Sequence, residues 1–217
     1  GGINNSNGRV IVNSGNIYVE DWDYGIRNTS GEVTINGGNI FAESVSTTYI
    51  IQNTSKANTT INGGYIQGNG DRVYGVYSTG TSNVIMTGGS IEINSNSALT
   101  YGIENYGSGI VTITGGTIQM NNTGVSSNQY SGYSIANKND GTIIIGDKNK
   151  EVSKDILLIA GNYTGTSSSG KSVGVYNEIG KLEFYNGTIQ GNQALSGGFT
   201  KIRDGYEIKS EIVDGIE

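Results

Sequence analysis

The chain has 217 residues, of which 34% are hydrophobic, 15% are charged and 36 are glycine, while proline, cysteine and histidine do not occur. Without cysteine and histidine it has no disulfide, no thiolate or imidazole metal site and no Ser-His-Asp triad. The net charge of −6, without a basic cluster, argues against nucleic-acid or anionic-membrane partners. No apolar run approaches the ~20 residues of a membrane-spanning helix.

An internal repeat begins with the first residues and continues along the chain. One unit runs from Gly25-Ile26-Arg27-Asn28 through Val33-Thr34-Ile35-Asn36-Gly37-Gly38 to Ile40, and it returns at 102–118. The last glycine of the motif recurs every 23 to 27 residues, at positions 15, 38, 64, 89 and 116. A sixth, degraded copy passes through 143–146, and a seventh spans 174–187.

The repeat also predicts how the chain is divided. We expect a repeat array over 1–197 with an insertion near 147–155, followed by terminal strands over 198–217 that act as a cap or as a junction. Residues 1–5 already match the middle of a unit, and no signal peptide precedes them. We therefore expect a segment of a longer protein with flanking modules.

Each unit contains three short segments of alternating character, rich in β-branched residues and bounded by Gly and Asn, which is the pattern of strands. Three such strands cannot enclose a core alone, but stacked units can. The predicted fold is all-β: a right-handed parallel β-helix, a solenoid of about seven coils with three short strands per coil. The inward columns of the first and third strands are expected at Ile3, Ile26, Ile51, Val76, Ile103, Ile135 and Val175, and at Ile17, Ile40, Ile66, Ile91, Ile118 and Ile189.

Three further columns keep the same register. The Gly-Gly pairs stand where the chain must turn a corner, so one residue of each pair is expected to have a positive φ. An asparagine column, with Ser78 in register, is expected to form amide hydrogen bonds between coils, at Asn5, Asn28, Asn53, Asn105, Asn137 and Asn177. A tyrosine column two residues before the first inward column is predicted to pack as a ladder that points inward or into a corner, at Tyr24, Tyr49, Tyr74, Tyr101 and Tyr133.

Units of the form Gly-Ile-x-Asn followed by Val-Thr-Ile-x-Gly-Gly-x-Ile resemble repeats in large adhesin-like surface proteins of bacteria. The implied fold is similar to that of the pectate-lyase-like superfamily, which includes polysaccharide lyases, glycoside hydrolases and non-catalytic adhesins. The resemblance implies an extracellular protein at the cell surface or attached to the cell wall, and it does not select an activity. Two hypotheses stay open: a non-enzymatic stalk that presents a carbohydrate- or host-binding face, and a polysaccharide-active lyase or glycoside hydrolase.

The outward side of the first strand offers a candidate ligand site. Arg27, Gln52, Tyr77 and Glu104 are expected on consecutive coils over roughly 14 Å, at the usual interstrand spacing, with Tyr176 further along. Aromatic and polar side chains over this length suit a short oligosaccharide, although a mixed solvated face is the simpler interpretation. Neither the first nor the second outward column stacks two carboxylates on adjacent coils, so no catalytic residue is predicted.

One loop carries the remaining candidate. Trp22 is the only tryptophan and lies between Asp21 and Asp23. It is either an exposed ligand anchor beside a weak Ca²⁺ site, since Ca²⁺ takes oxygen ligands, or part of a polar turn that packs over the coil edge. No other cofactor is expected.

Overall fold

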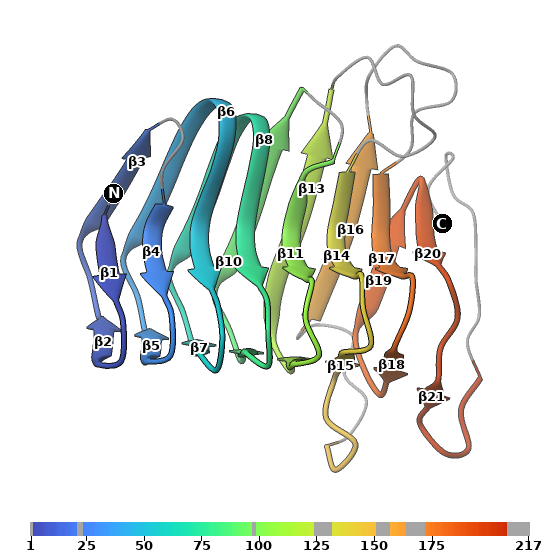
Figure 1. Ribbon diagram of the computed structural model, residues 1–217. Helices are drawn as coiled ribbons and strands as arrows, with labels where there is room; N and C mark the ends of the chain where they lie inside the picture. The colour runs from blue at the N-terminus through green and yellow to red at the C-terminus, as the bar shows by residue number, and fades with distance from the viewer. Residues whose placement is uncertain are drawn as a thin grey trace.

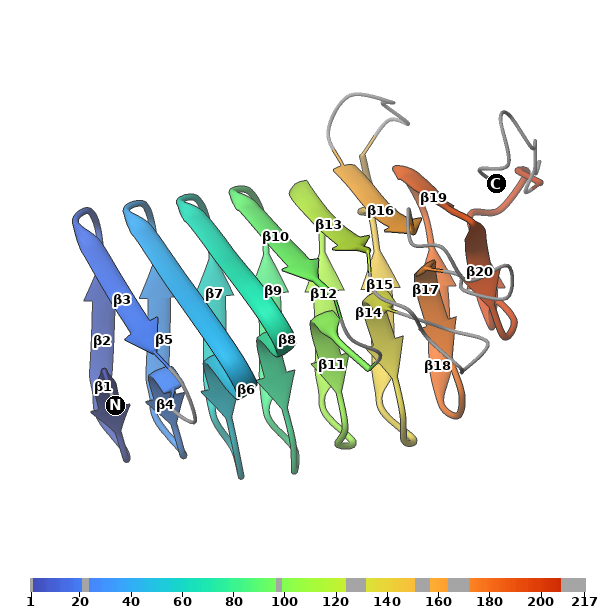
Figure 2. The same cartoon turned by 90° about the horizontal axis from the view of Figure 1, so that it is seen from above.

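The computed structural model describes residues 2–20, 24–96, 99–123, 132–150, 157–163 and 172–207, with only the backbone of 157–163. This part of the chain is an all-β parallel β-helix, so the predicted fold class is confirmed (Figures 1 and 2). Each pair of neighbouring strands among these residues is parallel and joins equivalent segments of successive coils.

The strands form three faces, named here by the order of their segments in each coil. The first face contains β1 (Ile3–Asn5), β4 (Tyr24–Asn28), β11 (Tyr101–Asn105), β14 (Gly132–Asn137), β17 (Ser172–Asn177) and β20 (Gln193–Ser196). The second face contains β2 (Arg9–Val12), β5 (Glu32–Ile35), β7 (Asn58–Ile61), β9 (Asn83–Met86), β12 (Ile110–Ile113), β15 (Thr142–Ile145), β18 (Lys181–Phe184) and β21 (Lys201–Ile202). The third face contains β3 (Asn16–Glu20), β10 (Ser90–Ser95), β13 (Gly116–Asn122), β16 (Leu157–Tyr163) and β19 (Thr188–Gly191).

Two long strands depart from the expected three short strands per coil. Strands β6 (Asn39–Asn53) and β8 (Tyr65–Ser78) each unite the third segment of one coil with the first segment of the next. Their pairing continues through this corner, with a shift in register between Ser44 and Thr47. The corner is therefore bridged by hydrogen-bonded strand in these coils rather than by a loop.

The number of coils is close to the prediction of about seven. The second face contains eight strands within the described residues, and the two-residue β21 is the last of them. It pairs with β18 through Glu183 with Lys201 and Phe184 with Ile202. Strand β21 thus lies in the predicted terminal segment, whereas residues 151–155 of the predicted insertion and 208–217 lie outside the described part.

The predicted inward columns form the core. Ile26, Ile51, Val76, Ile103 and Ile135 are in register and have no exposed surface. On the third face Ile40, Ile66, Ile91 and Ile118 are in register and buried, and the register continues through Ile159 to Ile189. β-Branched side chains stack well on the pleated surface, and burial of each contributes roughly 1.5–3 kcal/mol.

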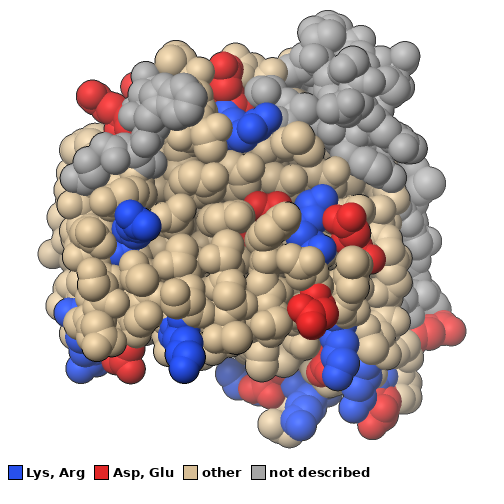
Figure 3. Space-filling view, in the orientation of Figure 1, with Lys and Arg blue, Asp and Glu red and all other residues tan. Residues whose placement is uncertain are grey.

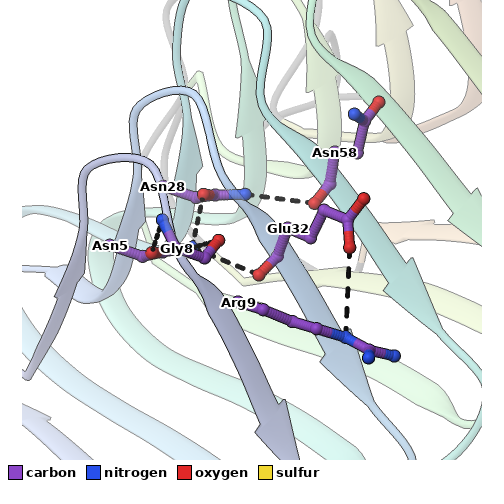
Figure 4. Close-up of polar contacts among 6 residues, drawn as sticks. All are labelled: Asn5, Gly8, Arg9, Asn28, Glu32 and Asn58. Carbon is purple, nitrogen blue, oxygen red and sulfur yellow. Dashed lines mark hydrogen bonds and ion pairs between the residues drawn. The ribbon is translucent and has the colours of Figure 1, made fainter.

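The asparagine column lines one inner corner of the solenoid. Asn5 donates to Asn28 Oδ1 at 3.0 Å and to the carbonyl of Glu32 at 3.1 Å, and Asn28 donates to the carbonyl of Asn58 at 3.1 Å (Figure 4). These buried amides satisfy carbonyl groups that the turn between the first and second segments would otherwise leave unpaired. The column is architectural, as the sequence predicted.

The corner glycines have the expected left-handed conformation. Gly38, Gly64, Gly89 and Gly116 have φ between 81° and 94° (values +82, +86, +81 and +94). They also stack closely, because a Cβ on Gly116 would lie 2.6 Å from the carbonyl oxygen of Gly89. Both the conformation and the space therefore require glycine here.

Candidate functional site

The predicted ligand column is present on the outer side of the first face. Arg27, Gln52, Tyr77 and Glu104 are in register on consecutive coils, and Tyr176 follows two coils beyond Glu104. Their exposure differs: Arg27 is exposed, Gln52, Tyr77 and Tyr176 are half-buried, and Glu104 is only 5% exposed. The expected alignment is confirmed, but Glu104 is not on a solvated surface.

The tyrosine column also lies on this outer side, so the prediction that it points inward or into a corner is wrong. Its rings contact outward side chains: Tyr49 lies 5.0 Å from Tyr77, and the guanidinium of Arg27 lies 5.8 Å from the ring of Tyr24. Tyr101 and Tyr133 pack in a cluster that is separate from the main core. The packing of the ladder is confirmed, because Tyr101 and Tyr133 are 4% and 5% exposed.

A glycine explains why inward and outward residues do not alternate strictly between the tyrosine column and the inward column of the first face. Gly75 and Gly102 stand between the tyrosine and the inward residue of their coils, and they face the core themselves. A Cβ on Gly75 would lie 2.7 Å from Cγ2 of Ile91, and one on Gly102 would lie 2.7 Å from Cγ2 of Ile118. Two consecutive residues therefore face inward, and the tyrosine before them is turned outward, as in a β-bulge.

We call the resulting surface the tyrosine face. Neighbouring rings lie in contact, with centroids 4.8 Å apart for Tyr49 and Tyr74 and 5.1 Å apart for Tyr74 and Tyr101. Stacked and edge-to-face rings at this distance stabilise one another. The surface consists of Tyr49, Tyr74, Tyr77, Tyr101, Tyr106, Tyr133 and Tyr176.

Glu104 lies among these rings. It is in register with Tyr77 on one side and with the fully buried Ala136 on the other. Burial raises the pKa of Glu104 to about 7, while the charge of Lys138 lowers it and that of Glu178 raises it. Burial and then Glu104 also raise the pKa of Tyr77, to about 12. Near neutral pH the site therefore combines neutral phenols with a carboxyl that is partly protonated.

A lysine completes the charged part of the tyrosine face. The ammonium of Lys138 lies 4.3 Å from the ring centroid of Tyr176 and 5.4 Å from that of Tyr133, and it pairs with Glu178 at 3.2 Å. Figure 3 looks onto this face, which is mostly uncharged, with acidic and basic side chains gathered toward its C-terminal half. The tyrosine face is thus mostly uncharged, and Lys138 and Glu178 lie toward its C-terminal end.

Sequence reasoning missed Tyr106, Lys138 and Glu178 as members of the site. Tyr106 is 52% exposed, and its ring centroid lies 6.3 Å from that of Tyr77. Each of these residues comes directly after an asparagine of the asparagine column. Because the asparagine points inward, the residue after it is expected to point outward. A third outward column could therefore have been derived from the sequence.

The remaining candidates concern metals and membranes. Trp22, Asp21 and Asp23 lie outside the described residues. Within the described ranges, no three acidic side chains come together as metal ligands. Over the same residues, no helix has the length and apolar character needed to cross a membrane.

The side chains of the tyrosine face are better suited to binding a ligand than to catalysing a reaction. Tyrosine rings offer flat apolar surfaces with a polar edge, and Glu104 and Lys138 add an acceptor and a donor. Searches against protein-family models, curated proteins and solved structures find no match to this chain. Function therefore has to be argued from the surface itself.

Proposed function

We propose that this chain is a stiff, non-enzymatic segment of an extracellular bacterial surface protein of the adhesin-like type, whose tyrosine face binds carbohydrate. The observation that carries the proposal is the outward tyrosine face with Glu104 at its centre. Sugar rings stack on aromatic side chains, and their hydroxyl groups need acceptors and donors close by. A place within the pectate-lyase-like superfamily is part of the same proposal and rests on the repeat motif.

Stiffness follows from the repeat, since each coil contacts only its neighbours and the coils add similar inward residues. A solenoid of this kind holds a binding face on a stiff support. The surface location is supported by the sequence motif, and the expected partners are a glycan or a host surface rather than nucleic acid.

A glycan array probed with the purified chain tests the proposal. The variant Tyr77→Ala/Tyr106→Ala removes two rings from the tyrosine face and should lose at least tenfold in affinity, which corresponds to 1.4 kcal/mol. Tyr18→Ala is the matched control, because Tyr18 is 71% exposed and stacks on Phe41 of the third face. Equal binding by the double variant and by the wild type would refute the proposal.

A polysaccharide-active module is the second candidate, and one observation favours it. A carboxyl with a pKa of about 7, such as Glu104, is suited to act as a general acid near neutral pH. Incubation of the chain with any glycan that it binds, followed by chromatography of the products, separates the two candidates. Cleavage that is lost in Glu104→Gln supports an enzyme, and stable binding without products supports a binding face.

A further inference from the structure

The carboxylate of Glu104 is the feature of the tyrosine face that packing alone does not explain. Its side chain is 5% exposed and points outward, since its neighbours Ile103 and Asn105 face the interior. Among the residues that the structure describes, no hydrogen bond or ion pair reaches this carboxylate. A charged acceptor that water can barely reach costs free energy, so its presence on an outer surface points to a donor that comes from outside the chain.

The same face already shows which group such a carboxylate accepts. The ammonium of Lys138 lies over Tyr133 and Tyr176 and pairs with the carboxylate of Glu178. This is an ammonium held by tyrosine rings and one acidic group. Glu104 has the corresponding neighbours, with Tyr77 in register and Tyr106 two residues further along, and their ring centroids are 6.3 Å apart. Here the rings and the acid are present, and the ammonium of Lys138 acts on Glu104 only through its charge, because it pairs with Glu178.

We propose that Glu104, Tyr77 and Tyr106 form a subsite for a protonated amine carried by a sugar, so that the tyrosine face prefers amino-sugar glycans. This inference rests on the proposed function, in which the face binds carbohydrate. An ammonium provides three donors to an acceptor-only carboxylate, and its charge is attracted by the faces of the two rings. A neutral hydroxyl provides one donor and no charge, and a carboxylated sugar would be repelled by Glu104.

The exposure of the three residues is consistent with such a subsite. Tyr106 is half exposed and lies at the end of its strand, whereas Tyr77 is held by Tyr49 and Tyr74 with centroids 5.0 and 5.5 Å away. The ring of Tyr77 is therefore held by two neighbours, whereas the ring of Tyr106 contacts Tyr77 and is otherwise open to a ligand.

The test compares three hexasaccharides by isothermal titration with the full 217-residue chain, at a pH of about 7, where Glu104 is about half ionised and much of the amine is protonated. The probes are the hexamers of glucosamine, of N-acetylglucosamine and of β-1,4-glucose. We expect the glucosamine hexamer to bind roughly tenfold more tightly than the other two, and Glu104→Gln to abolish this preference while it retains the weaker binding. The matched control is Glu32→Gln, which removes an exposed carboxylate of the second face, away from the tyrosine face, and should keep the preference.

The outcomes separate the inference from the proposed function. Equal affinity for the three hexamers, unchanged in Glu104→Gln, would overturn the amine subsite and leave carbohydrate binding intact. Absence of binding to all three hexamers and to every sugar of the array would remove both. Thermal unfolding of Glu104→Gln confirms that the variant is folded, and Tyr106→Ala provides an independent variant that should lose the same preference.

Discussion

The inward column of the first face and the outward column beside it follow opposite rules. Along the inward column of the first face, successive coils contribute Ile26, Ile51, Val76 and Ile103, which differ by at most one methylene. The adjacent outward column contributes Arg27, Gln52, Tyr77, Glu104, Ala136 and Tyr176, in which neighbouring coils share no chemistry. Positions that repeat in every coil therefore hold the architecture, and positions that vary between coils can hold a site.

Truncation of an inward residue should have the largest effect on stability. Ile103→Ala removes a fully buried side chain and is expected to lower the free energy of unfolding by about 2–5 kcal/mol. The control is Ile85→Ala on the outer side of β9, where the side chain is 43% exposed, and it should cost less than about 1 kcal/mol. Urea unfolding measures both, and similar losses in the two variants would contradict the division into inner and outer columns.

Replacement of Glu104 should raise the free energy of unfolding, whereas truncation of a core residue such as Ile103 lowers it. The pKa of Glu104 in the folded chain, about 7, lies above its ordinary value of 4.5, so the folded state binds the proton more tightly than the unfolded state. The stability from this group is complete below pH 4.5 and is lost as the pH rises to 7. Glu104→Gln should therefore match the wild type at acidic pH and exceed it above pH 7 by on the order of 3 kcal/mol, at ~1.36 kcal/mol per pKa unit.

Unfolding curves across this pH range provide the measurement. Glu32→Gln is the control, since Glu32 is an exposed residue that pairs loosely with Arg9 at 3.9 Å. A surface pair of this kind contributes little, so the control should show no comparable change with pH. A constant difference between Glu104→Gln and the wild type at all pH values would show that the carboxyl is not buried.

The same contrast explains how much the sequence could predict. The inward aliphatic residues, the corner glycines and the asparagine column, apart from its break at Ser78, recur from coil to coil, so their register followed from spacing alone. The outward direction of Tyr74 and Tyr101 did not follow, because Gly75 and Gly102 place two consecutive residues toward the core. The recurring glycine between tyrosine and isoleucine was the signal. The burial of Glu104 depends on side chains from adjacent coils, and no spacing within one coil reveals it.

The glycine that turns the tyrosine outward can be tested directly. A Cβ at Gly75 would lie 2.4 Å from the carbonyl oxygen of Gly102 and 2.7 Å from Cγ2 of Ile91. Gly75→Ala is therefore expected to cost about 1–3 kcal/mol through overpacking of the core. Gly198→Ala is the control, because a Cβ there would meet no atom within 4 Å. Equal thermal stability of the two variants would mean that position 75 does not face the core.

The asparagine column contains one break, and its repair should produce the smallest effect. Ser78 stands between Asn53 and Asn105, and it leaves Asn53 Nδ2 and Asn105 Oδ1 buried without partners. Its hydroxyl lies 2.7 Å from that of Ser82, four residues later. In the next two coils that later position is glycine, and the amides of Asn105 and Asn137 donate to the carbonyls of Gly109 and Gly141 at 3.2 and 3.0 Å.

The double variant Ser78→Asn/Ser82→Gly recreates the arrangement of those coils. Partners for the two orphaned amide atoms contribute about 1 kcal/mol each, whereas loss of the hydrogen bond from the Ser82 hydroxyl to the carbonyl of Thr79 and the entropic cost of one glycine offset much of this, so the expected net gain is below about 1 kcal/mol. The single variants serve as controls: Ser78→Asn alone collides with Ser82, and Ser82→Gly alone loses a hydrogen bond. Both single variants should therefore lower the free energy of unfolding, whereas the double variant should raise it. Thermal unfolding detects this coupling as a difference between the double variant and the sum of the single variants. Additive effects would show that Ser78 and Ser82 do not together take the place of an asparagine. The asparagine column would then tolerate substitutions as readily as the outward column of the first face does.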